Sequence, residues 1–217
     1  EGKDPRPILV RPVADRIVER AILQCLQAGT PVQALIQSAS SFGAIPERGV
    51  RCGVEAVVKA IRAGGRYYVR SDIGGFFQRI PRSQVIERVA SLLPDDSLVP
   101  LLEQATEVDR AIFRDEDVGK YRELFPTPEE GVAQGGCLSA FLGNVAMEEF
   151  DSMMSGAGAW TVRYVDDFIT LAGSETAAME RFEQGRKHLL GMGMKVYEPD
   201  GSRRDKADAG RTAALFE

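Results

Sequence analysis

The sequence predicts an α+β fold in which helices pack against a small antiparallel β-sheet. Apolar residues recur at helical spacing in several long segments, whereas short runs of aromatic and β-branched residues indicate strands. The predicted order along the chain is helix, helix, strand, two helices, helix, hairpin, helix and strand. This order is typical of the α+β class.

Two amphipathic helices and a strand are predicted in the first third of the chain. Pro12 can open the first helix and Gly29 closes it. Its predicted inward face consists of Val13, Ile17, Ala21, Ile22 and Leu26. The second helix stops at Gly64-Gly65, and its predicted inward face consists of Val54, Val57, Val58 and Ile61. Residues 67–73 then form a strand that ends near Asp72.

The rest of the chain is predicted to alternate helices with short strands. Helices are expected over 82–93 and 97–113, a surface loop over 114–133, and helices over 138–154 and 175–190. A β-hairpin is expected from strands 160–164 and 168–171 with its turn at 165–167, and a last strand at 194–197.

Composition excludes several classes of function. His188 is the only histidine, and Cys25, Cys52 and Cys137 form no CxxC pair, which opposes a Ser-His-Asp triad, structural zinc and a disulfide framework. The scattered cysteines fit a reducing cytoplasm best. No apolar run is long enough for a membrane span, so no membrane partner is expected. The net charge is −5, yet residues 1–94 carry 14 Lys and Arg against 8 Asp and Glu. A nucleic-acid contact is therefore sought there, although a solvated basic face would have the same composition.

Two consecutive aspartates at the tip of the predicted hairpin are the strongest chemical signal. Asp166-Asp167 lie between apolar and aromatic residues without a glycine to make the turn, and two such close like charges repel each other. A divalent cation would neutralise them, and Asp72 at the end of another strand could complete the site. Hard oxygen ligands of this kind select Mg²⁺, and three acids without histidine suit two-metal phosphoryl transfer.

Arg163-Tyr164-Val165-Asp166-Asp167-Phe168 spans the predicted hairpin turn, and a second segment runs from Asp72 through Phe77 to Ile80. These motifs, and others around them, resemble those of bacterial reverse transcriptases, the group II intron and retron-like family. Arg163 to Phe168 match the Tyr-x-Asp-Asp signature and its neighbours, and Asp72 to Ile80 resemble the first catalytic motif. Residues 131–140, followed by Asn144, resemble the Gly-x-Pro-Gln-Gly segment, with Ala133 and Ala140 in place of prolines. Segments 6–16 and 41–48 resemble fingers motifs. The matches follow the family order over nearly the whole chain.

The resemblance implies a right-handed polymerase palm, an antiparallel sheet backed by helices, with helical fingers. Residues 1–65 would form the fingers and 66–217 the palm, with fingers elements returning within 82–133. The chain stops about where the primer-grip segment would begin, so the thumb is expected to be absent.

The resemblance also implies roles for single residues. Asp72 and Asp166 would be the principal metal ligands, Asp167 a supporting acid, and the Ile73 carbonyl a further ligand. The residues that would contact the incoming nucleotide are Phe77 beneath its sugar, Gln134 with Gly135 beside it, Arg6 on its triphosphate and Lys206 as proton donor to pyrophosphate. For the neighbouring Phe76, core packing is expected. Lys195 is the alternative to Lys206.

The implied function is RNA-directed DNA synthesis in a bacterial cytoplasm, for a retroelement or for antiviral defence. Its cofactors would be two Mg²⁺ ions, with Mn²⁺ as a substitute. Its partners would be an RNA template, a DNA or RNA primer, dNTPs and a cognate structured RNA. Val165 in place of the commonest alanine leaves the subfamily open. The alternatives are a template-independent or protein-primed DNA synthase, a catalytically silent RNA-binding scaffold and, more remotely, an RNA-directed RNA polymerase or a nucleotide-cyclase-like palm.

Overall fold

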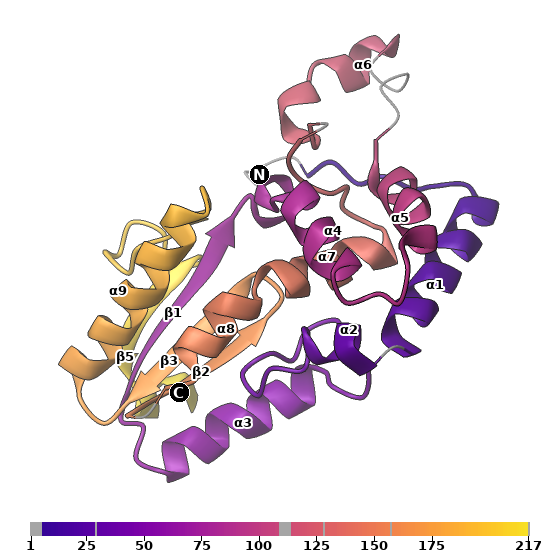
Figure 1. Ribbon diagram of the computed structural model, residues 1–217. Coiled ribbons are helices and arrows are strands. Elements are labelled where there is room, and N and C mark those ends of the chain that lie inside the picture. The colour runs from indigo at the N-terminus through magenta and orange to yellow at the C-terminus, as the bar shows by residue number, and fades with distance from the viewer. Residues whose placement is uncertain (1–5, 29, 109–113, 128, 157, 217) are drawn as a thin grey trace. The chain divides into compact units, whose positions relative to one another are not determined.

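The computed structural model describes residues 6–28, 30–108, 114–127, 129–156 and 158–216, and these form an α+β protein (Figure 1). The chain divides into two compact units. The first comprises Glu1–Leu35 and Phe77–Ala146, and the second comprises Ile36–Phe76 and Met147–Glu217. The predicted fold class is confirmed, and the predicted border between fingers and palm at residue 65 stays a prediction.

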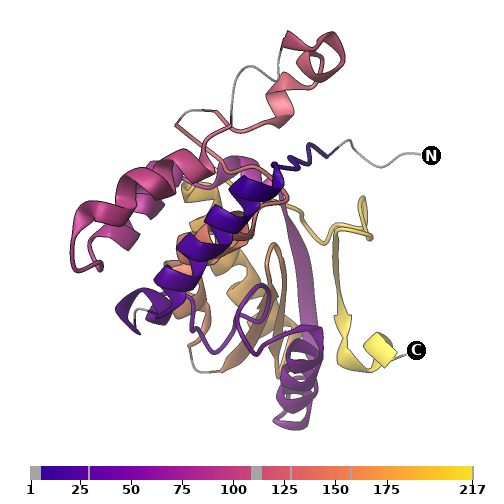
Figure 2. The same cartoon turned by 90° about the vertical axis from the view of Figure 1, so that its right-hand side faces the viewer.

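The second unit is built on an antiparallel sheet. Among the residues described, its five strands are β1 (Tyr67–Gly74), β2 (Ala159–Tyr164), β3 (Asp167–Ala172), β4 (Lys195–Val196) and β5 (Ala207–Arg211). The strand order is β2-β3-β1-β4. Both β5 and β4 pair with the β1 edge that faces away from β3: β5 pairs with the first part of β1, and β4 pairs with its last two residues. β1 and β5 lie side by side in Figures 1 and 2.

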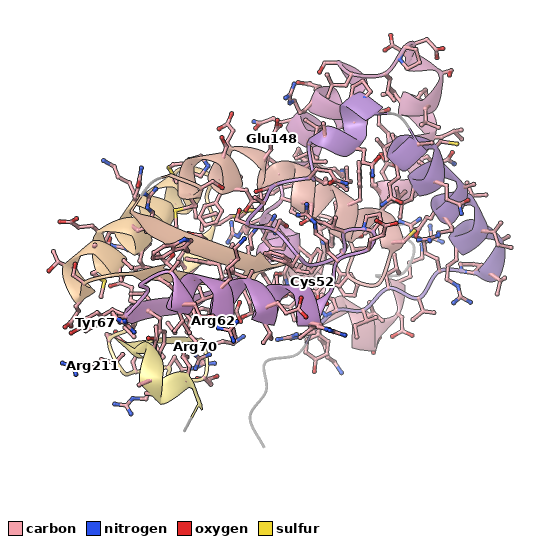
Figure 3. The ribbon with its side chains drawn as sticks, turned by 90° about the horizontal axis from the view of Figure 1, so that it is seen from below. Cys52, Arg62, Tyr67, Arg70, Glu148 and Arg211 are labelled. Atoms are coloured by element: carbon pink, nitrogen blue, oxygen red, sulfur yellow. The ribbon has the colours of Figure 1, made fainter. Side chains whose placement is uncertain are left out.

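Helices cover both faces of this sheet. On one face, Phe168 of β3 packs against Phe150 of α8 (Glu148–Met154) and Phe182 of α9 (Glu175–Gly191), with ring centroids 5.4 and 6.0 Å apart. On the other face, Tyr68 and Leu171 pack against Ala60 of α3 (Val50–Arg62), which Figure 3 shows running across the sheet. This two-sided burial explains why β3, at the centre of the sheet, is apolar from Phe168 to Ala172 apart from Thr170.

The first unit is helical. Its helices are α1 (Val13–Ala28), α2 (Thr30–Ala34), α4 (Arg82–Ala90), α5 (Val99–Thr106), α6 (Glu116–Gly119) and α7 (Cys137–Ala146). Helices α1, α5 and α7 contact one another, and each has a completely buried leucine: Leu26, Leu102 and Leu142. Across the part of the chain that the structure describes, no helix has the length and apolar character that a membrane span requires.

The first two predicted helices are confirmed as α1 and α3, but their predicted inward faces are partly wrong. Gly29, the predicted end of the first helix, lies outside the described residues. In α1 the buried residues are Glu19, Ile22, Leu23 and Leu26, whereas Val13 and Ile17 are 63% and 64% exposed. In α3 the buried residues are Gly53 and Ala60, and Val54 is exposed. Both helices carry apolar stripes wider than the neighbouring elements cover, so periodicity alone did not identify the buried half.

Three predicted segments have different bounds in the structure. The helix expected over 138–154 is two helices, α7 and α8, separated at Met147, which is fully buried and has no neighbouring Gly or Pro to mark the break. The helix expected over 97–113 ends at Thr106, because Glu107 is extended, and residues 109–113 lie outside the described residues. The loop expected over 114–133 contains α6 and a short 3₁₀ helix, Arg122–Leu124.

Strand β5 is an element that the sequence did not predict. Its residues, Ala-Asp-Ala-Gly-Arg, have little intrinsic preference for strands. They form a strand because they pair with β1, from Ala207 opposite Ser71 to Arg211 opposite Tyr67. Figure 3 shows Tyr67 and Arg211 at this end of the sheet, where the guanidinium lies 5.8 Å from the ring centroid.

Candidate active site

Three aspartates of the second unit come together at the tip of the β2–β3 hairpin. Asp72 of β1 is the direct cross-strand partner of Asp167, the first residue of β3, and such partners project from the same face of a sheet. Asp166 lies in the turn that precedes Asp167, and its carbonyl oxygen accepts a hydrogen bond from the Ile73 N–H at 3.0 Å. The structure therefore brings together the acids that the sequence selected.

Asp72 lies on β1 between the part that pairs with β5 and the part that pairs with β4. Its N–H donates to the Lys206 carbonyl at 3.0 Å, and its own carbonyl accepts from the Tyr197 N–H at 3.4 Å. The Lys206 ammonium forms an ion pair with the Asp72 carboxylate. These side chains are only 22% and 13% exposed, so water screens the pair less than it would on an open surface. Lys195, the other candidate, lies over the Tyr197 ring at 5.4 Å from its centroid, and Lys206 lies over the same ring at 5.8 Å.

The chemistry of the carboxylates fits a divalent cation. Among the described residues, no group of three or more His, Cys, Asp or Glu side chains is already arranged to hold a metal ion. Carboxylate oxygens are nevertheless the ligands that Mg²⁺ prefers, and Asp72 already binds one cation, the Lys206 ammonium. Metal ligation by Asp72, Asp166, Asp167 and the Ile73 carbonyl stays a prediction.

Four of the five predicted nucleotide contacts, Arg6, Phe77, Gln134 and Gly135, lie in the first unit on neighbouring segments, whereas Lys206 lies in the second. Ile8 forms a parallel bridge with Gln134, and the Leu9 N–H donates to the Gln134 carbonyl at 2.8 Å. This bridge brings the segment that follows Arg6 beside Gln134. The Val132 N–H donates to the Phe77 carbonyl at 2.8 Å, so Phe77 lies next to the same segment.

Position 135 requires glycine in this arrangement. Its φ of +116° is a conformation that side chains rarely adopt, and an added Cβ would lie 2.8 Å from the Leu9 carbonyl oxygen. Phe77 is half-buried, whereas Phe76 is 2% exposed, as expected for core packing. The proposed nucleotide roles of Arg6, Phe77, Gln134 and Gly135 stay predictions.

Each unit also has a hollow on its surface. A cavity of about 1090 Å³ in the first unit contains Arg11, Arg82 and Arg122 with several acids, but none of the predicted site residues. A groove of about 540 Å³ in the second unit has valines of α3 on one wall, and Tyr164, Asp167 and Lys206 also line it. The second hollow, not the larger first one, therefore adjoins the carboxylates.

Sequence reasoning missed the partner of Arg163. This arginine is completely buried and forms a 2.6 Å ion pair with Asp151 of α8, which is 2% exposed. An arginine inside an apolar strand indicates a buried acid somewhere in the fold. Nothing near Asp151 in the sequence identifies it as that acid.

Comparison with known proteins shows the family. Residues 1–198 match the model of the reverse transcriptase (RNA-dependent DNA polymerase) family. Protein YkfC of Escherichia coli is 28% identical over 153 residues, which cover 69% of this chain and 37% of YkfC. The chain thus spans little more than a third of this relative.

Solved structures show the same fold at much lower identity. The telomerase of Candida tropicalis in complex with the TWJ fragment of telomeric RNA has a TM-score of 0.55 and 14% identity, over 91% of this chain and 33% of that one. The apo telomerase of the same species has a TM-score of 0.52 and 13% identity, over 92% and 37%. These likenesses place the α+β architecture among polymerase palms. The family model that matches residues 1–198 shows more than the fold: the chain belongs to the reverse transcriptase family.

Proposed function

We propose that the chain is the catalytic core of an RNA-directed DNA polymerase that adds dNTPs to a primer 3′-hydroxyl by two-metal phosphoryl transfer. One observation carries the proposal: Asp72 and Asp167 are cross-strand partners, and Asp166 adjoins them in the hairpin turn. Carboxylates are hard ligands of the kind that such chemistry uses, and these occur in a chain of the reverse transcriptase family.

In the proposed mechanism, Asp72, Asp166 and Asp167 would hold Mg²⁺ beside the hairpin turn, and Mn²⁺ would substitute for it. The chemistry that two such ions supply is activation of the primer 3′-hydroxyl and neutralisation of charge on the triphosphate. Lys206 stays beside Asp72 through backbone pairing as well as its ion pair. An ammonium group held there can give a proton to the leaving pyrophosphate.

The first unit would supply the other nucleotide contacts. Arg6 would bind phosphate oxygens through its planar guanidinium, and Gln134 would hydrogen-bond the incoming nucleotide while Gly135 lets its backbone approach. Phe77 would lie beneath the sugar, where a rigid ring excludes a 2′-hydroxyl. The proposed partners are an RNA template, a DNA or RNA primer and a cognate structured RNA, in a bacterial retroelement or defence system.

The test is primer extension on an RNA template with Mg²⁺ and dNTPs, using the full-length form of the protein. We expect template-directed DNA synthesis that Asp166→Ala/Asp167→Ala abolishes. The chain offers a matched control, because Asp95 and Asp96 are also adjacent aspartates and both are exposed. Asp95→Ala/Asp96→Ala removes the same two charges and should leave synthesis intact.

Two other outcomes would change the conclusion. Synthesis that ignores the template sequence would keep the metal chemistry and indicate a template-independent or protein-primed synthase. If neither the wild type nor the double variant makes DNA on any primer or template, the polymerase proposal is wrong and a nucleic-acid-binding scaffold remains.

A further inference from the structure

The hairpin turn that carries Asp166 is held in a strained conformation. Val165 has a φ of +59°, in the left-handed region, which is a genuine outlier for a β-branched residue. Such a conformation persists only where surrounding groups impose it, and it commonly occurs at functional sites. The neighbours of Val165 are therefore informative.

One of these neighbours is the buried guanidinium of Arg163. Its Nε and Nη2 donate to the two Asp151 carboxylate oxygens at 2.8 and 2.6 Å, and Nη2 also donates to Ser41 Oγ at 2.8 Å. The remaining nitrogen, Nη1, donates to the Val165 carbonyl oxygen at 2.7 Å. The guanidinium thus connects α8, the loop at Ser41 and the strained turn.

The loop over residues 38–49 supports the same turn from a second direction. Its backbone pairs with Arg163 on both sides: the Arg163 N–H donates to the Ser40 carbonyl at 2.7 Å, and the Phe42 N–H donates to the Arg163 carbonyl at 2.9 Å. Arg48 fixes the loop by donating to the carbonyls of Ser38 and Ser41. The strand end and the loop therefore form one hydrogen-bonded assembly.

Gly43 brings this loop into direct contact with the turn. A Cβ at Gly43 would lie 2.6 Å from both the backbone nitrogen and Cγ2 of Val165, and 3.1 Å from the Tyr164 carbonyl carbon. Real Cβ atoms essentially never approach so closely, and two of the three atoms belong to backbone. Glycine is required here by the closeness of the turn.

We propose that the loop over 38–49 and the buried Arg163–Asp151 pair form a brace that fixes the Val165-Asp166 turn. Arg163, Asp151 and Gly43 are then positioning residues, which act by setting where the carboxylates of Asp166 and Asp167 lie. The inference rests on the proposed function only in taking those carboxylates as catalytic. A buried ion pair gives little net stability because desolvation opposes it, so holding one specific geometry is the better reason for this pair.

The test uses Gly43→Ala and Arg163→Lys, with Gly49→Ala and Arg186→Lys as matched controls. Gly49 belongs to the same loop, but a Cβ there would meet nothing within 4 Å. Arg186 forms an ion pair on the surface of α9. Because small misplacements of reacting groups can cost about 100-fold in rate, we expect both test variants to lower kcat by about 10- to 100-fold. The KM for dNTP should change little, and the controls should behave as the wild type.

A second variant separates positioning from stability. Val165→Gly removes the Cγ2 contact and tolerates the left-handed conformation, so in the Gly43→Ala background it should recover part of the lost kcat. That interaction between neighbouring sites is measured by a double-mutant cycle. A brace that only stabilised the fold would lower the melting temperature and leave the kcat of the folded protein unchanged, which would overturn the proposal.

Hydrogen exchange tests the brace without relying on activity. Amides of residues 160–170 should exchange faster in Gly43→Ala than in Gly49→Ala, while those of α9 stay the same. Unchanged exchange at the turn would overturn the brace. Faster exchange in a protein that makes no DNA even as wild type would instead support the brace and contradict the proposed polymerase function.

Discussion

At the scale of single residues, the buried polar side chains of the second unit depend on partners far away in the sequence. Arg163 pairs with Asp151, and the Tyr68 hydroxyl donates to Asp208 at 2.8 Å. The exceptions among the described residues are His188 Nε2 and the hydroxyls of Thr161 and Thr170, two cross-strand partners; these buried atoms have no hydrogen-bond partner. A buried titratable group that forms a hydrogen bond, such as Tyr68, makes the stability of the protein sensitive to pH.

Tyr68 should make the protein sensitive to alkali. Burial, together with the hydrogen bond to Asp208, raises the pKa of Tyr68 above its usual 10.0. The folded protein therefore holds this proton to higher pH than the unfolded chain does. The stabilisation is fully present below the unfolded pKa and is lost as pH rises through the folded pKa. Between about pH 9 and about pH 11 the melting temperature of the wild type should fall further than that of the Tyr68→Phe variant. Parallel curves for the two proteins would contradict this assignment.

At the scale of elements, α3 shows how the fold uses only part of an apolar helix. Ala60 is 2% exposed against Tyr68 and Leu171, whereas Val54 is 55% exposed and lies along the groove beside Asp167 and Lys206. The small side chain at position 60 lets the helix approach the sheet closely. The valine at position 54 does not take part in that packing.

This difference predicts opposite responses to substitution on one helix. Ala60→Leu should overpack the interface and lower the free energy of unfolding by about 1–3 kcal/mol. Val54→Lys should change it by less than about 0.5 kcal/mol, because the residue is exposed. Urea denaturation of both variants measures the two values. Equal losses would mean that α3 does not pack on the sheet in this orientation.

At the scale of the whole molecule, ligands should stabilise the native state through the hairpin acids. Mg²⁺ takes substrate phosphates as further ligands, and Lys206 already neutralises Asp72. We therefore expect Mg²⁺ with a dNTP to raise the melting temperature more than Mg²⁺ alone. At a ligand concentration of 100 Kd the gain is about 2.7 kcal/mol, which for a protein of this size corresponds to roughly 5–10 °C.

The matched proteins for this measurement are the two double variants. On addition of Mg²⁺ with a dNTP, the melting temperature of Asp95→Ala/Asp96→Ala should rise as much as that of the wild type. The melting temperature of Asp166→Ala/Asp167→Ala should not rise. An equal rise in both would place the ligand elsewhere on the molecule and remove the hairpin acids from the site.

The sequence by itself determined the α+β class, the hairpin and the three aspartates at its tip. These follow from local signals: periodicity indicated the helices, aromatic and β-branched runs indicated the strands, and adjacent acids in an apolar setting indicated a candidate site. The motifs in their order also identified the family that the comparison confirmed.

Only the tertiary structure decided the remaining features, because each depends on which segments meet. Pairing with β1 made a strand of 207–211 and brought Lys206 to Asp72. Neighbouring helices selected the buried half of α1, and packing divided the helix expected over 138–154. The acid paired with Arg163 and the reason for glycine at position 43 likewise appear only once distant segments are in contact. Local sequence states what a segment can form, whereas long-range pairing and burial decide which of those possibilities is used.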